Sequence, residues 1–223
     1  GSGEAVLTTL RLIARREGVG ELLAQGVREA ARRIGGGAES FAMHVKGLEL
    51  PGYEPRGLQT MALGFAVGTR GADHNRSGAY QVDFSEGVDR FAPDDAAIAG
   101  AIETEDEAAV MDALILCKFL RGVFAAGFPS RAQMLALVTG WDVTARELRD
   151  AAASIVTLKK RYNIEQGWHP AEDALPRRLL EEPLPDGVGR GMRLSETRLQ
   201  EMIRAYNLAR GWSEEGYVDL DET

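Results

Sequence analysis

The spacing of apolar residues predicts helices over most of the chain. Apolar positions recur every three to four residues in several segments, which is the period of an amphipathic helix. Two such segments lie between Glu4 and Ile34, where Gly18, Val19 and Gly20 separate them. Further helices are expected over residues 58–67, 94–101, 105–124, 130–138, 144–162 and 195–210. The pattern favours an all-α fold, an irregular multi-helix arrangement.

The segment 105–124 carries the strongest helical pattern. Glu105, Asp106 and Glu107 fall in its expected first turn, where negative side chains are stabilised by the helix dipole. Its second half is almost wholly apolar, which predicts deep burial. Farther along, Thr144 and Glu147 have the spacing of a capping box at the start of a helix.

Two stretches interrupt the helical pattern. Residues 40–57 contain two prolines and three glycines, so only a short extended piece over 45–50 is expected there. Residues 68–76 form a polar loop with two arginines and a histidine. Between these stretches, the small residues Ala62, Gly64 and Ala66 predict that another backbone packs closely against the helix 58–67.

Composition narrows the class of protein. The 223 residues are 44% apolar and 27% charged, which is ordinary for a globular protein with a buried core. The net charge is −8 and no basic patch stands out, which argues against nucleic acid as a partner. The longest apolar stretches, such as 111–117, are too short to span a membrane. The single cysteine excludes a disulfide framework, and we expect a reducing, cytoplasmic setting.

Cys117 and Asp112 are the informative residues of the apolar segment. Free cysteine is often a small hydrophobic residue of the core, and that is one interpretation of Cys117. The other is a thiolate ligand of a metal, whose remaining ligands would then come from outside this chain. Asp112 must be paired or hydrogen-bonded, because an isolated buried carboxylate is too costly.

Two loop segments carry basic side chains that could bind an anion. His74 lies between Arg70 and Arg76, and this grouping suits an anionic ligand, although a surface loop histidine is an equal alternative. Arg56 could hold a phosphate, or it could brace its loop by pairing with Glu49 or Glu54. The sequence contains no phosphate-binding loop, zinc-protease or EF-hand motif.

Several stretches occur in an order that one enzyme family shares. They are RREGVGELLAQG (15–26), VKGLELPGYEPRG (45–57), TRGADH (69–74), DALILC (112–117), YNI to LPR (162–177) and RGW (210–212). They are similar to the stretches REGIGxLLAxG, VKGxExPxYDPRG, TRGAxH, DxxGLC, FNxREG to LPxR, and RGW of the aldehyde:ferredoxin oxidoreductases. The resemblance is collinear over nearly the whole chain.

The resemblance implies a set of cofactors. The family holds a tungsten or molybdenum ion between two pterins, together with one [4Fe–4S] cluster. By resemblance, Cys117 is the fourth cluster ligand, and Asp112 and Leu116 contact a pterin beside the cluster. His74 is implied as the active-site histidine near the metal, and Arg76 lies near the same pterin.

The resemblance also implies a domain division and a reaction. Residues 1–57 would end a middle helical domain and 58–223 would form the C-terminal helical domain. The β-rich pterin base and the other cluster cysteines would lie upstream, so this part alone is not expected to be active. The implied reaction oxidises a small aldehyde to a carboxylate and passes electrons to ferredoxin. A homo-oligomer is compatible with the family.

Two departures from the family pattern keep other hypotheses open. Ile115 stands where the motif DxxGLC has glycine, and YNIEQG at 162–167 lacks the arginine of its counterpart. One alternative is a helical interaction module that kept the fold and lost the cofactors. Another is an unrelated helical ligand-binding domain with an anion site at Arg70, His74 and Arg76.

Overall fold

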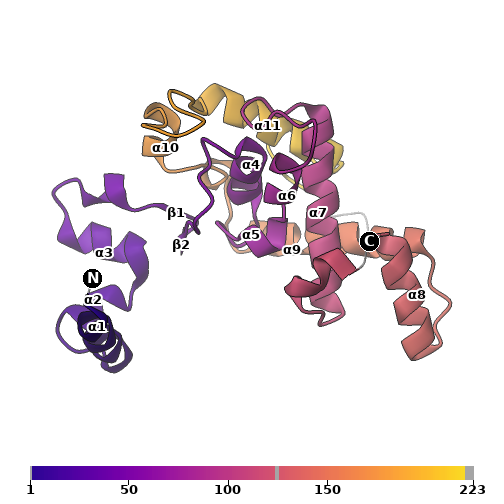
Figure 1. Ribbon diagram of the computed structural model, residues 1–223, viewed down its shortest axis with the longest axis horizontal. Coiled ribbons are helices and arrows are strands. Elements are labelled where there is room, and N and C mark those ends of the chain that lie inside the picture. The colour runs from indigo at the N-terminus through magenta and orange to yellow at the C-terminus, as the bar shows by residue number, and fades with distance from the viewer. Residues whose placement is uncertain (1, 124–125, 219–223) are drawn as a thin grey trace.

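The computed structural model describes residues 2–123 and 126–218 and shows a helical protein with one small hairpin (Figure 1). The predicted all-α class is confirmed. No helix of the described residues is long and apolar enough to cross a bilayer. The elements are α1 (Gly3–Arg15), α2 (Val19–Leu23), α3 (Gly26–Ile34), η1 (Ala38–Phe41), β1 (His44–Val45), β2 (Leu48–Glu49), α4 (Gln59–Val67), α5 (His74–Ser77), α6 (Tyr80–Asp83), α7 (Asp95–Ala113), η2 (Lys118–Val123), α8 (Phe128–Thr139), α9 (Ala145–Glu165), η3 (Pro170–Glu172), α10 (Arg177–Glu181) and α11 (Glu196–Ala209).

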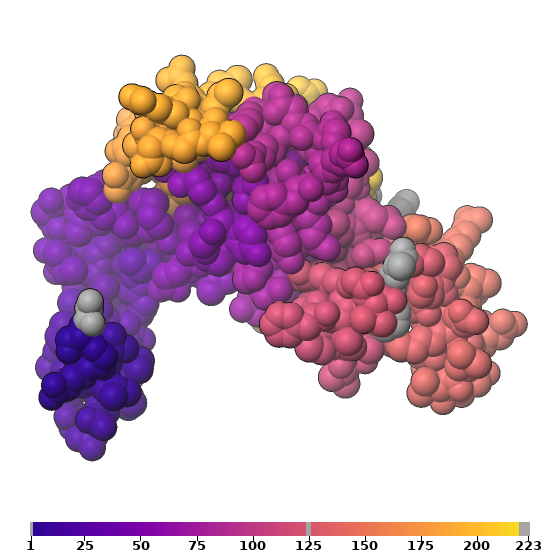
Figure 2. Space-filling view, viewed as in Figure 1, coloured from indigo at the N-terminus to yellow at the C-terminus, as the bar shows by residue number. Residues whose placement is uncertain are grey.

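The first helices lie at one end of the molecule. Three helices, α1 to α3, occupy the segment in which two were expected. They project from the body at the indigo end of Figures 1 and 2, whereas α8 projects at the opposite end. No residue of α1 is buried, and its apolar stripe with Val6, Leu7 and Leu10 is exposed.

A two-stranded hairpin follows the first helices. β1 and β2 pair antiparallel, with Val45 opposite Leu48. Lys46 and Gly47 form the turn, both with positive φ (52° and 89°), as the tight hairpin turn that matches strand twist requires. The single extended piece predicted over 45–50 is therefore divided by a turn into two two-residue strands.

Helix α4 is the centre of the core. Every residue from Gln59 to Val67 is buried, and α5, α6, α7 and α11 surround the helix. A Cβ on Gly64 would lie 2.0 Å from the Ser77 hydroxyl oxygen of α5, so the predicted close packing is confirmed. Asp83 of α6 caps α4 by accepting hydrogen bonds from the backbone N–H groups of Thr60 and Met61, at 3.0 and 2.8 Å. Burial raises the pKa of Asp83, and these hydrogen bonds oppose the rise.

The predicted helix 105–124 is wrong at both ends. Helix α7 begins at Asp95, with Asp94 as its N-cap, and therefore takes in the short helix expected over 94–101. It ends at Ala113, and Phe124 lies outside the described residues.

The acidic triplet therefore lies in the middle of α7 rather than in a first turn. Its partners are distant arginines: Arg210 contacts Glu105 and Asp106 at 2.5 and 2.6 Å, and Arg131 contacts Glu107 at 3.2 Å. These carboxylates join α7 to its neighbours, and the helix dipole is not the reason for their position.

The later helices match their predictions closely. Thr144 and Glu147 form the expected capping box, and α9 continues to Glu165. Ser195 caps α11 by accepting a hydrogen bond from the N–H of Arg198. Strong local signals at the start of each helix explain the agreement.

A buried carboxylate joins the hairpin to the C-terminal half. The Asp173 carboxylate forms ion pairs with the ammonium groups of Lys46 at 2.8 Å and Lys160 at 3.1 Å. It also accepts a hydrogen bond from the indole N–H of Trp168 at 3.0 Å. The Lys160 ammonium also lies 3.1 Å from the centroid of the Trp168 ring, within cation–π range. Burial lowers the pKa of Lys160 to about 8, although Asp173 opposes this.

Asp173→Asn should lower the free energy of unfolding by about 3 kcal/mol, because two buried ammonium groups lose their counter-charge. Urea denaturation followed by circular dichroism measures the change. Asp142→Asn is the matched control on an exposed carboxylate and should leave stability unchanged. Equal stability of the two variants would contradict a central role for Asp173.

Candidate functional site

The way in which helix α7 ends determines the position of the Cys117 thiol. The N–H of Leu116 donates to the carbonyl of Met111 at 2.8 Å, and the N–H of Ile115 donates to that of Asp112 at 3.1 Å. Ile115 has φ of 57°, in the left-handed region. These two hydrogen bonds and the left-handed residue form the Schellman motif, which terminates a helix.

Cys117 is exposed and lies outside any helix, so its predicted place in a buried helix is wrong. The cause is the helix end at Ala113, after which the chain turns away from the core before η2 begins. The side chains of Ile115 and Phe119 beside it are 92% and 97% exposed. Cys117 is therefore not a small hydrophobic residue of the core.

Asp112 is paired, as predicted. Its carboxylate contacts the Arg76 guanidinium at 2.7 Å and the Lys118 ammonium at 2.9 Å. Lys118 also donates to the carbonyl of Ala108 at 2.8 Å. Burial lowers the pKa of Lys118, and Asp112 opposes this shift. This network ties α5, the end of α7 and the start of η2 together.

His74 opens the short helix α5. Asp73 caps this helix and also pairs with Arg70 at 3.2 Å. The imidazole packs against two aromatic rings, with centroid distances of 5.1 Å to Tyr53 and 6.2 Å to Tyr80. The two tyrosine rings stack on each other at 4.7 Å. The histidine therefore sits against an aromatic wall and is not an isolated loop residue.

Arg121 links the segment that carries Cys117 to the helix that carries His74. From η2 it donates to the hydroxyl of Tyr80 and to the backbone carbonyl of Asn75, the latter at 2.9 Å. Sequence reasoning missed Arg121, Tyr53 and Tyr80. Only Tyr53 had a signal, since it lies inside the stretch 45–57.

The loop before α5 rests directly on the hairpin. Gly71 has φ of +89°, and a Cβ there would lie 2.1 Å from the carbonyl oxygen of Val45. Asn163 of α9 holds the same loop by donating to the carbonyl of Thr69 at 2.5 Å. The position of His74 thus depends on both the hairpin and α9.

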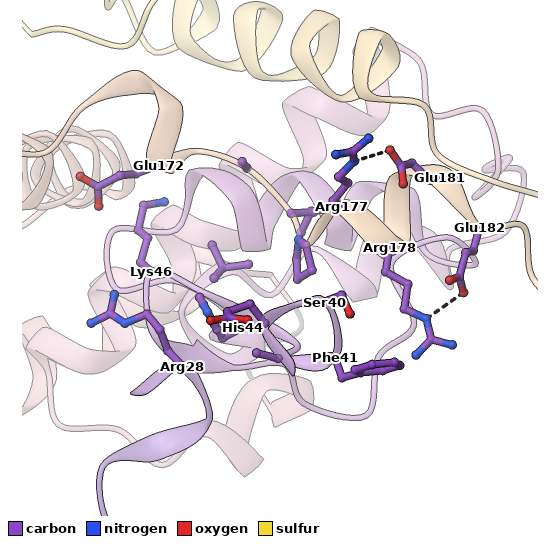
Figure 3. Close-up of a pocket in the computed structure, with 16 residues that line it drawn as sticks. Arg28, Ser40, Phe41, His44, Lys46, Glu172, Arg177, Arg178, Glu181 and Glu182 are labelled. Carbon is purple, nitrogen blue, oxygen red and sulfur yellow. Dashed lines mark hydrogen bonds and ion pairs between the residues drawn. The ribbon is translucent and has the colours of Figure 1, made fainter. Parts of the chain in front are cut away.

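The other polar candidates have structural roles. Arg56 pairs with Glu54 at 2.8 Å and donates to the carbonyl of Glu182 at 3.0 Å, so it braces its loop. A groove of about 670 Å³ between the hairpin, η1 and α10 is lined by Arg28, His44 and Lys46, and by the ion pairs Arg177–Glu181 and Arg178–Glu182 (Figure 3). None of the predicted site residues lines this groove.

The structure thus brings the predicted residues to one region. Arg76 contacts Asp112 directly, His74 begins the helix of Arg76, and the half-buried Leu116 precedes Cys117. Within the described ranges, no three residues among His, Cys, Asp and Glu cluster as metal ligands. A metal group at Cys117 would therefore take its other ligands from elsewhere.

Comparison with known proteins identifies the family. The family described as "Aldehyde ferredoxin oxidoreductase, domains 2 & 3" matches residues 1–222. The chain belongs to the aldehyde ferredoxin oxidoreductase family. It is 34% identical to the tungsten-containing aldehyde ferredoxin oxidoreductase of Pyrococcus abyssi over 98% of its length, and 33% identical to that of Pyrococcus furiosus over 100%. It is 25% identical over 97% of its length to the WOR-like subunit of an aliphatic sulfonate oxidoreductase of Pyrococcus furiosus.

The chain covers only part of these relatives. It spans 35% of the Pyrococcus abyssi protein, 36% of the first Pyrococcus furiosus protein and 33% of the second.

The backbone conformation at Ile115 explains why the family motif has glycine at this position. The glycine of DxxGLC corresponds to position 115, which terminates α7 in the left-handed region. Glycine adopts this conformation without steric strain. In this chain a β-branched residue occupies that conformation, and it is 92% exposed to solvent. The glycine thus has a role in ending the helix that is independent of any cofactor.

Ile115→Gly should raise the free energy of unfolding by about 1 kcal/mol, because it removes a side chain that strains the left-handed backbone. Urea denaturation measures the gain, and Ile115→Val should show none. A loss of stability in the glycine variant would refute this account of the helix end.

Proposed function

We propose that this chain forms part of an enzyme that oxidises aldehydes to carboxylates and passes the electrons through a [4Fe–4S] cluster to ferredoxin. A tungsten- or molybdenum-bis-pterin cofactor would serve as the first electron acceptor. The observation that carries the proposal is the exposed Cys117, fixed next to the Asp112–Arg76 pair in a chain of this family. The upstream polypeptide would supply the remaining ligands and complete the site.

Cys117 fits the role of a cluster ligand. Its thiol is exposed and follows a helix end that is fixed by two backbone hydrogen bonds. Iron–sulfur clusters are held by cysteine sulfurs, and this thiol lies in a segment that also carries Lys118 and Arg121. A lone thiol can only complete a cluster whose other cysteines lie elsewhere in the protein.

Asp112, Arg76 and Leu116 fit the edge of a pterin. The Oδ1 atom of Asp112 pairs with Lys118 and keeps a lone pair, which can accept an N–H of the heterocycle, whereas Oδ2 is buried against Arg76. Arg76 can donate to the ring's carbonyl or nitrogen acceptors. The half-buried Leu116 provides an apolar surface between Asp112 and Cys117.

His74 is proposed to act on the substrate. Conversion of an aldehyde and water to a carboxylate releases protons and a pair of electrons, and the bound metal centre supplies the electron-accepting chemistry. An imidazole can donate a hydrogen bond to the aldehyde oxygen and exchange a proton there. Tyr53 and Tyr80 pack against the imidazole ring, and Arg121 donates a hydrogen bond to the Tyr80 hydroxyl.

Cys117→Ala in the full-length protein should lower the iron content and alter or abolish the cluster's electron paramagnetic resonance spectrum. Metal analysis and spectroscopy measure both effects. Phe119→Ala changes a neighbouring exposed residue and should leave both unchanged. Normal iron and an unaltered spectrum in the cysteine variant would remove Cys117 from the cluster. Absence of iron, tungsten and molybdenum in the unmodified protein would instead favour the cofactor-free interaction module.

His74→Ala should lower kcat about 100-fold or more while the metal content stays near normal, because proton transfer by a side chain contributes at least that factor. Aldehyde oxidation with a reducible dye measures turnover. His169→Ala alters an exposed histidine far along the chain and serves as the control. Loss of metal with little change in turnover per bound metal would make His74 a structural residue.

A further inference from the structure

A second pocket lies beside the candidate site, between α9 and the loop before α5. Its volume is about 520 Å³. It shares only Arg76 with the residues proposed to serve the pterin. It is lined by Thr69, Arg70, Arg76, Leu158, Lys159, Tyr162 and Asn163.

Three cations face this pocket, and their charges are not balanced. Arg70 pairs with Asp73 at 3.2 Å and Arg76 pairs with Asp112 at 2.7 Å. The Lys159 ammonium group has no ion pair or side-chain hydrogen bond within residues 2–123 and 126–218. Burial and the nearby Arg76 lower the pKa of Lys159, whereas Asp112 opposes the change. Burial of an unpaired charge costs free energy, so a half-buried ammonium group near another cation is stabilised when an anion binds to it.

The remaining wall of the pocket is apolar. Leu158 and Tyr162 lie one helical turn apart on α9, and their side chains are 65% and 60% exposed. The hydrogen bond from Asn163 to the carbonyl of Thr69 fixes α9 against the loop that carries Arg70. The pocket therefore combines a cationic end with an apolar wall on a braced frame.

We propose that this pocket binds a small organic anion, a carboxylate or sulfonate attached to an aromatic or aliphatic body. Lys159 is the primary partner of the anionic group, with Arg70 and Arg76 beside it. Leu158 and Tyr162 contact the apolar body. The volume suits a small-molecule ligand. Inorganic phosphate is a poorer match, because both arginines already have carboxylate partners and the apolar wall would stay uncovered.

The test measures binding directly and does not depend on catalysis. The purified full-length holoenzyme is titrated with 2-naphthoate at low ionic strength, by calorimetry or by the probe's fluorescence. Lys159→Gln should weaken binding about tenfold, as expected for loss of one charge-assisted contact. Lys159→Arg keeps the charge and should stay within about threefold of the unmodified protein. Arg146→Gln, an exposed cation at the start of the same helix, is the control and should change nothing.

Three ligands define the chemistry of the pocket. Naphthalene-2-sulfonate should bind like 2-naphthoate, and the uncharged 2-naphthamide should bind at least about tenfold more weakly. No binding of 2-naphthoate to the holoenzyme, equal binding of the amide, or full affinity in Lys159→Gln would each overturn the proposal. If Lys159→Gln does not fold, Arg70→Gln removes a more exposed cation of the same pocket and should weaken binding in the same direction. Turnover can be normal or lost in these variants without affecting the result, so failure here is distinct from failure of the proposed function.

Discussion

The carboxylate of Asp173 joins segments that are far apart in the sequence. It holds Lys46 of the hairpin turn, Lys160 of α9 and the indole of Trp168 in one buried cluster. Lys46 in turn donates to the carbonyl of Ala66 at the end of α4. Removing one partner of a buried charge is costly, so this cluster couples the hairpin, the central helix and α9 energetically. Because the loop before α5 lies on the hairpin, the position of His74 depends on this cluster.

The candidate site is built from a helix end and a few cations. The Schellman motif at Ile115 turns the chain out of the core and exposes Cys117. Asp112, in the last turn of the same helix, then binds Arg76 and Lys118, and Arg121 contacts Tyr80 and Asn75. The segment that carries Cys117 and the helix α5 that carries His74 are therefore linked twice, once through Asp112 and once through Arg121. Such a frame limits how far either group can move relative to the other.

The sequence predicted the elements whose signals are local. The capping box at Thr144 and the close packing at Gly64 each depend on residues within a few positions or on a small side chain. The end of α7 could not be predicted, because DALILC contains neither glycine nor proline and Ile115 takes a backbone conformation that its side chain disfavours. The roles of the long-range partners also escaped prediction, since Arg210 lies 104 positions from Asp106 and Arg121 lies 41 positions from Tyr80. For the candidate site, the sequence required a partner for Asp112 but could not identify Arg76.

The contact between Gly71 and the carbonyl of Val45 has a genetic consequence. Every single-base change in a glycine codon that alters the amino acid adds a Cβ, and at this position a Cβ would lie 2.1 Å from a backbone oxygen. No first mutational step at this codon leaves the loop and the hairpin where they are. A lineage that reshapes the neighbourhood of His74 must therefore do so through other codons, or move the hairpin first.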